Sequence, residues 1–193
     1  MSSLNITILG LSSLQDQIAE IARLYPSDPT HGSPFDIVTS NQLSPEYKHL
    51  AAFQGNLMFI GGRRYLLGHA SRTQNTWGWL SKLGKNVSRL GRQISLTWGY
   101  GGRPTQPASG VLAWMLSAMN FINTLDPNLP AETSTAATKL PVLWPQWKTP
   151  SAGGPSSLLT LTDNNGTIIT ADNFRAEAIG FLSNLLLKEG QEK

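Results

Sequence analysis

The side chains of this chain best suited to acid–base chemistry near neutral pH are three histidines. His31 lies in a proline-rich loop, His49 in a predicted helix, and His69 in the sequence Gly-His-Ala-Ser. Hydrolysis by a Ser-His-acid triad also needs a serine on a sharp turn, usually Gly-x-Ser-x-Gly, and a carboxylate that orients the histidine. No Gly-x-Ser-x-Gly occurs, and no acid flanks His69. We therefore predict no catalytic residue, and we interpret His49 and His69 as surface residues.

Sequence motifs for cofactors and metals are also absent. There is no P-loop, no Gly-x-Gly-x-x-Gly after a predicted strand, and no His-x-x-x-His pair. The chain contains no cysteine, which excludes a thiolate metal site and a disulfide framework. The sequence therefore predicts neither a cofactor-binding residue nor a metal ligand.

Charge is unevenly distributed along the chain. The formal net charge is +3, yet no acidic residue stands between Glu46 and Asp126. Cations interleaved with aromatic rings, as in this interval, can bind nucleic acid. The alternative is that the cations reach several faces and the tryptophans serve a core, and the low charge density favours it. The residues concerned are Lys48, Arg63, Arg64, Arg72, Lys82, Lys85, Arg89, Arg92 and Arg103, with Tyr65, Trp77, Trp79, Trp98 and Tyr100.

A length of 193 residues, with 40% hydrophobic and 14% charged residues, is sufficient for one domain. Hydrophobic spacing and end signals predict helices over 12–25, 44–60, 111–124 and 172–189. We predict strands over 75–80, 157–162 and 167–170, the last two joined by an Asn165-Gly166 turn. Gly61-Gly62 is expected to weaken or break the second helix. The predicted buried positions, in helix order, are Leu14, Ile18, Ile21 and Tyr25; Leu50, Phe53, Leu57 and Ile60; Leu112, Met115, Met119 and Ile122; and Phe174, Ala178, Phe181, Leu182 and Leu185.

Several short segments, taken in order, match one known family. They are Leu24-Tyr-Pro-Ser-Asp-Pro29 with Gly32-Ser-Pro-Phe35, Lys48-x-Leu-Ala-Ala-Phe-Gln-Gly55, Arg63-Arg64-Tyr65-Leu66-Leu67, Gln74-Asn75-Thr76-Trp77, Phe121-Ile-Asn-Thr-Leu-Asp-Pro-Asn128, Trp144-Pro145 and Phe174-Arg-Ala-Glu-Ala-Ile-Gly-Phe-Leu182. In their order and spacing they resemble the fungal type-B carboxylesterase/lipase group of the α/β-hydrolases.

This resemblance implies a fold and an activity. The matching segments belong to the C-terminal portion of an α/β-hydrolase fold, in which helices pack on a few late strands. Residues 1–193 would then be a partial carboxylesterase type-B domain, incomplete by itself. The parent enzymes hydrolyse carboxylic esters by a Ser-His-acid mechanism, and the helix predicted over 44–60 would contribute to the wall of the acyl pocket.

The resemblance fails at about 90–112. There the family carries its catalytic histidine in a Gly-x-x-His-x-Ser-Asp type of motif, whereas residues 90–104 contain neither a histidine nor an acid. His69-Ala-Ser71 imitates the motif but lies upstream of the expected position. We therefore expect the chain to be inactive alone. A frameshifted or mis-spliced gene would explain the stretch. A non-enzymatic module that binds nucleic acid or a protein partner through the basic and aromatic region, including Arg63 and Arg64, is the alternative.

Further expectations concern location and partners. Residues 1–10 lack a signal peptide, and no stretch is long and apolar enough for a transmembrane segment, whereas the resemblance implies secretion. Three sequons, at Asn5, Asn86 and Asn165, would matter in a secreted protein. An ester or lipid substrate is expected only if the missing N-terminal part completes the fold. The C-terminal helix, through Phe181, Leu182 and Leu185, could form a homodimer, or could face its own core.

Overall fold

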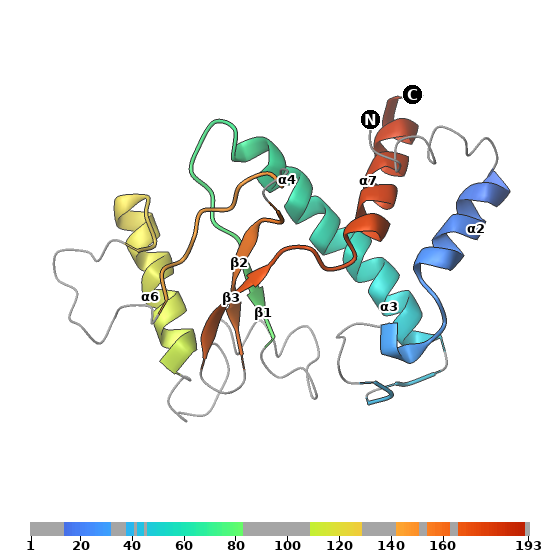
Figure 1. Cartoon of the computed structure of the whole chain (residues 1–193), viewed down its shortest axis with the longest axis horizontal. Helices are drawn as coiled ribbons and strands as arrows, with labels where there is room; N and C mark the ends of the chain where they lie inside the picture. The colour runs from blue at the N-terminus through green and yellow to red at the C-terminus, as the bar shows by residue number, and fades with distance from the viewer. Residues whose placement is uncertain are drawn as a thin grey trace. The chain divides into compact units, whose positions relative to one another are not determined.

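The computed structural model describes residues 14–31, 38–40, 42–44, 46–82, 109–128, 142–150, 154–162 and 166–191 (Figure 1). They form two compact units. The first unit comprises Met1–His69 and Asn173–Lys193, and the second comprises Ala70–Asp172. Each unit has its own core.

The first unit is built from helices. They are α2 (Leu14–Leu24), the short 3-10 helix η1 (Pro29–His31), α3 (Tyr47–Gly55), the π-helical segment η2 (Asn56–Gly61), α4 (Gly62–Ala70) and α7 (Ala176–Gln191). The segments α3, η2 and α4 follow one another without a break, and α7 packs against η2 (Figure 1). The core contains Tyr25, Ala52, Ala178, Phe181 and Leu182. The helices predicted over 12–25, 44–60 and 172–189 are confirmed.

The glycine pair does not break the helix, contrary to the stronger form of our prediction. The hydrogen bonding changes to a π-helical turn that ends at Gly61, and α4 begins at Gly62. A Cβ atom on residue 61 would lie 3.0 Å from the carbonyl oxygen of Asn56. A side chain at position 61 would therefore press against this carbonyl oxygen, so the π-helical turn favours glycine there, and Gly61 is part of the helix rather than a stop signal.

Several predicted buried positions in this unit are wrong. Leu14, Ile18 and Leu50 are 70%, 56% and 59% exposed, whereas Ala52 and Asn56 are buried. The face of α3 and η2 that enters the core carries small or polar residues, which hydrophobic periodicity does not select. In α7 the prediction is confirmed for Ala178, Phe181 and Leu182.

The second unit contains a mixed sheet of three strands in the order β1-β2-β3. The strand β1 (Trp79–Ser81) runs parallel to β2 (Ser157–Leu161), and β2 is antiparallel to β3 (Thr167–Ala171). The predicted hairpin over 157–170 is confirmed, and Gly166 accepts a hydrogen bond of 3.0 Å from the backbone N–H of Thr162. A parallel pair beside a hairpin makes the sheet mixed, and the molecule as a whole belongs to the α/β class, as predicted.

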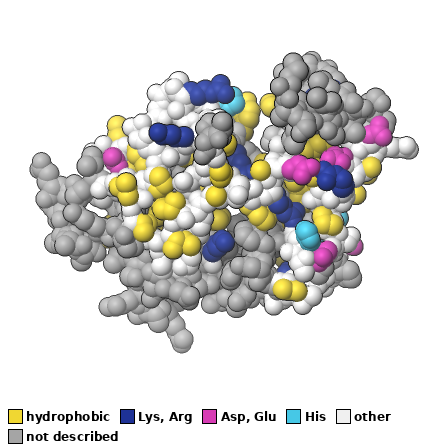
Figure 2. All heavy atoms as spheres, in the orientation of Figure 1, with side chains coloured by type: hydrophobic (Ala, Val, Ile, Leu, Met, Phe, Trp, Pro, Cys, Tyr) yellow, Lys and Arg dark blue, Asp and Glu magenta, His cyan; other side chains and the backbone are white. Residues whose placement is uncertain are grey.

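Helix α6 (Ser109–Thr124) packs on this sheet through an aromatic core. Trp114 joins Trp144, Leu159 and Leu161 in the core, and its ring lies 4.7 Å from that of Trp79. The predicted apolar stripe is wrong at Met119 and Ile122, which are 55% and 70% exposed. Among the described side chains of this helix, Trp114 and Ser117 are buried instead. Apolar side chains at the surface are visible in Figure 2.

The described residues bear only in part on the expectations about a transmembrane segment, the stretch at 90–112 and the sequons. Among the described helices, none combines the length and the apolar character that a membrane span requires. Of the anomalous stretch at 90–112, residues 90–108 lie outside the described residues, as do Asn5, Asn86 and Asn165, and the side chain of Leu112 is not described.

Candidate functional site

The three histidines each make local contacts. The Nδ1 atom of His69 lies 2.9 Å from the carbonyl oxygen of Tyr65, one turn earlier in α4, and the two rings pack at 4.3 Å. His31 faces Asp28 at 4.0 Å, and the Nδ1 atom of His49 lies 3.5 Å from a carboxylate oxygen of Glu46. None of them contacts a serine within the described part of the chain. His69 therefore already has a hydrogen-bonding partner other than a catalytic serine.

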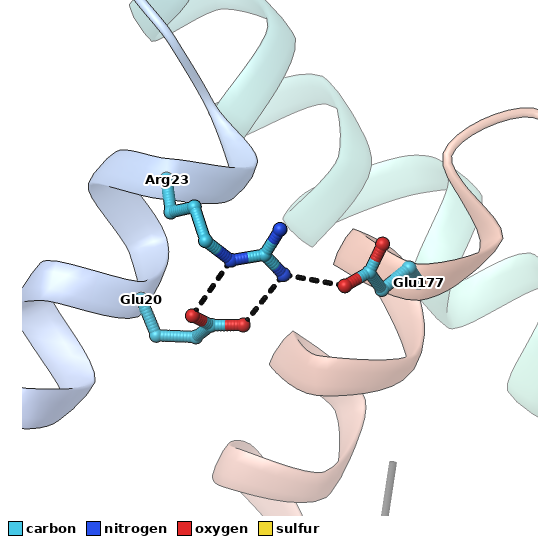
Figure 3. A network of polar contacts seen from close by, with 3 residues as sticks. All are labelled: Glu20, Arg23 and Glu177. Carbon is cyan, nitrogen blue, oxygen red and sulfur yellow. Dashed lines mark hydrogen bonds and ion pairs between the residues drawn. The ribbon is translucent and has the colours of Figure 1, made fainter. Parts of the chain in front are cut away.

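A small ionic network joins α2 to α7 in the first unit (Figure 3). The guanidinium of Arg23 donates to both carboxylate oxygens of Glu20, at 2.9 and 2.8 Å, and also to Glu177. The hydrogen bond from Arg23 lowers the pKa of Glu20. Because all three side chains serve one another and Arg23 and Glu177 are exposed, the network ties the helices together and offers no poised acid or base.

The buried polar centre of the same unit surrounds Tyr25. Asn56 donates a hydrogen bond of 3.0 Å from Nδ2 to the Tyr25 hydroxyl, and the Arg175 guanidinium lies 5.1 Å from the centre of the Tyr25 ring. Burial raises the pKa of the Tyr25 hydroxyl and lowers the pKa of Arg175. Arg64 donates at 3.0 Å to the carbonyl of Phe174 and so fixes the chain just before α7. These contacts position α7 against η2.

Lys48 is the most deeply buried cation among the described residues, with 1% of its surface exposed. Its ammonium group donates to the carbonyl oxygen of Val38. Burial lowers the pKa of the Lys48 ammonium. The amine is thus held by a backbone oxygen, and it anchors the segment before α3.

A pocket of about 220 Å³ lies between η2, the first turn of α4, and α7. Its walls are apolar side chains, its floor includes Gly61 and Gly62, and Asn56, Tyr65 and Ser183 add polar groups. The apolar side chains are Leu57, Ile179, Leu182, Leu186 and Leu187. Our sequence reasoning missed this pocket because it interpreted the glycine pair as a helix breaker. The signal was present in two adjacent glycines inside a helix, opposite the small side chain of Ser183.

The described residues of the basic and aromatic region are divided between the two units. Arg64 binds a backbone carbonyl within the first unit, whereas Trp77 and Trp79 pack against the aromatic core of the second. Trp77 and Trp79 therefore serve a core, whereas Tyr65 is 50% exposed and Tyr100 lies outside the described residues. Lys85, Arg89, Arg92, Trp98 and Arg103 lie outside the described residues.

Among the described residues of the second unit, Asp172 is a buried acid. The side chain of Asp172 is 6% exposed and accepts a hydrogen bond of 3.0 Å from the Trp147 indole. Thr76 in turn donates to the carbonyl of Trp147 at 3.1 Å, which connects the segment before β1 to the loop before β2. The described residues contain no cluster of histidines and acids that could hold a metal ion. The buried polar contacts of this unit therefore serve its structure.

Comparison with known proteins identifies the relatives of the chain. No protein-family model matches it. It is 34% identical over 164 residues to secreted lipase 1 of Botryotinia fuckeliana, which covers 82% of this chain and 26% of that lipase. It is 31% identical over 187 residues to lipase 4 of Diutina rugosa, covering 91% of this chain and 31% of that protein. The chain is a relative of the fungal lipases.

This relationship agrees with the resemblance found in the sequence. Lipase 2 of Diutina rugosa is 29% identical over 195 residues, which amount to 94% of this chain and 33% of that protein. The lipase relatives imply an α/β-hydrolase fold, in keeping with helices packed around a small mixed sheet. The chain spans about a quarter to a third of the length of the lipases that it matches.

Proposed function

We propose that this chain is the C-terminal portion of a carboxylic ester hydrolase of the fungal lipase type, and that residues 1–193 form one partial domain. Its similarity to three lipases covers 82–94% of its own length, which supports the family. It covers 26–33% of theirs, which supports a portion of the fold rather than the whole. In this proposal the chain supplies late strands, the helices packed on them, and no catalytic side chain.

The contact of His69 carries the proposal that this chain is inactive alone. A general base must reach the proton of its nucleophile, and its other ring nitrogen must be oriented by an acid. His69 instead bonds through Nδ1 to the carbonyl of Tyr65, and its ring packs at a tilt of 41° against the Tyr65 ring. The family places its catalytic histidine within the stretch that corresponds to 90–112, and residues 90–104 contain no histidine.

In the complete enzyme, a serine would attack the ester carbonyl, backbone N–H groups would hold the oxyanion, and a histidine would transfer the proton. The exposed side of α3 and η2 would form part of the wall of the acyl pocket. Leu50, Met58 and Phe59 are 59%, 65% and 60% exposed, and they leave an apolar surface that the first unit does not cover. Such a surface suits the alkyl part of an ester or lipid.

We extend this proposal to location and assembly. Two relatives are named as secreted lipases, from Botryotinia fuckeliana and Gibberella zeae, which supports a secreted protein. A homodimer through α7 would use exposed Leu186 and Leu187, because Phe181 and Leu182 lie in the core of the first unit.

The test uses the purified chain and p-nitrophenyl butyrate. We expect no hydrolysis above the rate in buffer and no covalent labelling by a fluorescent phosphonate that reacts with activated serines. The proposal would be contradicted by hydrolysis that both the phosphonate and the substitution His69→Gln abolish. Binding to single-stranded DNA that weakens with salt and with Arg63→Ala plus Arg64→Ala would support the binding module instead.

A further inference from the structure

We propose that the pocket between η2, α4 and α7 binds a single unbranched alkyl chain. The pocket lies wholly within the first unit, on the side of η2 and α4 that faces α7. The exposed side of η2, which carries Met58 and Phe59, does not line it. This inference does not depend on ester hydrolysis, because the alkyl chain is held as a ligand.

The residues that line the pocket indicate the chemical class of its ligand. Leucine and isoleucine side chains form most of the lining, and no charged side chain contributes to it. The polar groups of the lining are those of Asn56, Tyr65 and Ser183. Asn56 is 2% exposed, and its amide already donates to the Tyr25 hydroxyl. An uncharged alkyl group therefore loses no charge–solvent interaction on entering, and a hydroxyl at its end could bond to Tyr65 or Ser183, which also line the pocket.

The shape of the pocket favours a linear chain. Its lining on α7 extends from Ile179 to Leu187. That span is about 12 Å at the usual rise of an α-helix. A volume of about 220 Å³ over that length corresponds to a channel about 5 Å wide, which admits one methylene chain at carbon–carbon contact distances of about 4 Å. A rigid cage or a wide ring system would not fit.

The glycine pair provides this space. A Cβ atom on residue 62 would meet no atom within 4 Å, so the floor of the pocket is empty because residue 62 has no side chain. A Cβ atom on residue 68, in the same helix, would also meet no atom within 4 Å, but Gly68 does not line the pocket. Gly62→Leu and Gly68→Leu are therefore a matched pair, since both improve helix propensity and only one fills the pocket.

The experiment is calorimetric titration of the whole chain and both variants with 1-octanol, 1-butanol and 1-adamantanol. We expect saturable binding of 1-octanol, with 1-butanol at least about tenfold weaker because it buries fewer methylene groups. Gly62→Leu should weaken 1-octanol binding about tenfold or more, the equivalent of two lost methylene contacts, and Gly68→Leu should change it by less than about twofold. Ser183→Leu, which fills the pocket from α7, should act like Gly62→Leu.

Three results would overturn the proposal. The first is the absence of saturable 1-octanol binding to the chain. The second is equal binding by the Gly62→Leu and Gly68→Leu variants, which would place the ligand elsewhere. The third is binding of 1-adamantanol as tight as that of 1-octanol, which would exclude a narrow channel. Each outcome is independent of esterase activity, so it leaves the proposed function untouched.

Discussion

The hydrogen bond between Asn56 and Tyr25 should be a major stabilising contact of the first unit. The two side chains are 2% and 1% exposed, and 3.0 Å separates the Asn56 amide nitrogen from the Tyr25 hydroxyl. Tyr25→Phe removes the hydroxyl but keeps the ring, and with it the contacts to Phe53 at 5.4 Å and to Arg175 at 5.1 Å. The change therefore isolates the polar contact from the packing.

The magnitude follows from burial. Tyr25→Phe leaves the Asn56 amide without this acceptor in a site closed to water, which costs about 2 kcal/mol of unfolding free energy. Asn56→Leu, of similar size, should cost a comparable amount because it leaves the Tyr25 hydroxyl without its donor. The double variant should cost less than the sum of the two by about 1 to 2 kcal/mol, since it removes both partners together.

The assay is urea unfolding followed by far-ultraviolet circular dichroism, which reports on the helices of this unit. Tyr65→Phe is the matched control, because Tyr65 is 50% exposed and its hydroxyl can bond to water. We expect the control to change the unfolding free energy by less than about 0.5 kcal/mol. The reasoning is refuted if Tyr25→Phe costs no more than this control, or if the two changes at 25 and 56 are additive.

Three further predictions follow from the same contacts. Gly62→Ala should raise the unfolding free energy by about 0.5 to 1 kcal/mol. Gly61→Ala should not raise it, because the new Cβ atom would lie 3.0 Å from the Asn56 carbonyl oxygen. Urea unfolding midpoints of the two variants test this prediction, and equal gains in stability would contradict it. Arg23 lowers the pKa of Glu20 in the folded chain, so this ion pair stabilises the chain above the unfolded pKa of the carboxyl and loses that effect as the pH falls through the folded value. Unfolding free energy should therefore fall more steeply between about pH 5 and pH 3 in the unmodified chain than in Glu20→Gln, and identical pH profiles would argue against it. Trp147→Phe removes a 3.0 Å hydrogen bond to the Asp172 carboxylate, and Trp144→Phe removes a 3.0 Å hydrogen bond to the neutral carbonyl of Gly78. Because hydrogen bonds to charged groups are stronger, Trp147→Phe should cost more stability. Thermal unfolding compares the two variants, and a larger loss in Trp144→Phe would refute this reasoning.

Sequence reasoning was most successful where local signals were strong. The strands β2 and β3, which flank the sequence Asn165-Gly166, pair as predicted, and the apolar spacing of α7 matches its buried residues Ala178, Phe181 and Leu182. Both features depend on residues close in sequence, which is why a single chain contains enough information to predict them.

The missed features depend on contacts between distant segments. Leu50 was predicted to be buried, yet the core-facing side of that helix carries Ala52 and Asn56, because α7 and Tyr25 approach closely there. Periodicity also assumes a constant 3.6 residues per turn, and the π-helical turn from Asn56 to Gly61 breaks that assumption. The pocket depends on the same turn and on α7, more than a hundred residues later in the chain, so the adjacent glycines indicate space beside the helix but not which segment closes it.

The central claim is that this chain folds as a portion of a lipase fold and contains no catalytic histidine. It is tested most directly with two chimeras of Diutina rugosa lipase 4. In the first chimera this chain replaces the matching segment of the lipase. The second chimera is the same, except that residues 90–112 of this chain are exchanged for the lipase 4 segment that aligns with them. We measure hydrolysis of p-nitrophenyl butyrate by each purified chimera. The account predicts no activity for the first chimera and measurable activity for the second. Activity in the first chimera, or a folded but inactive second chimera, would contradict it.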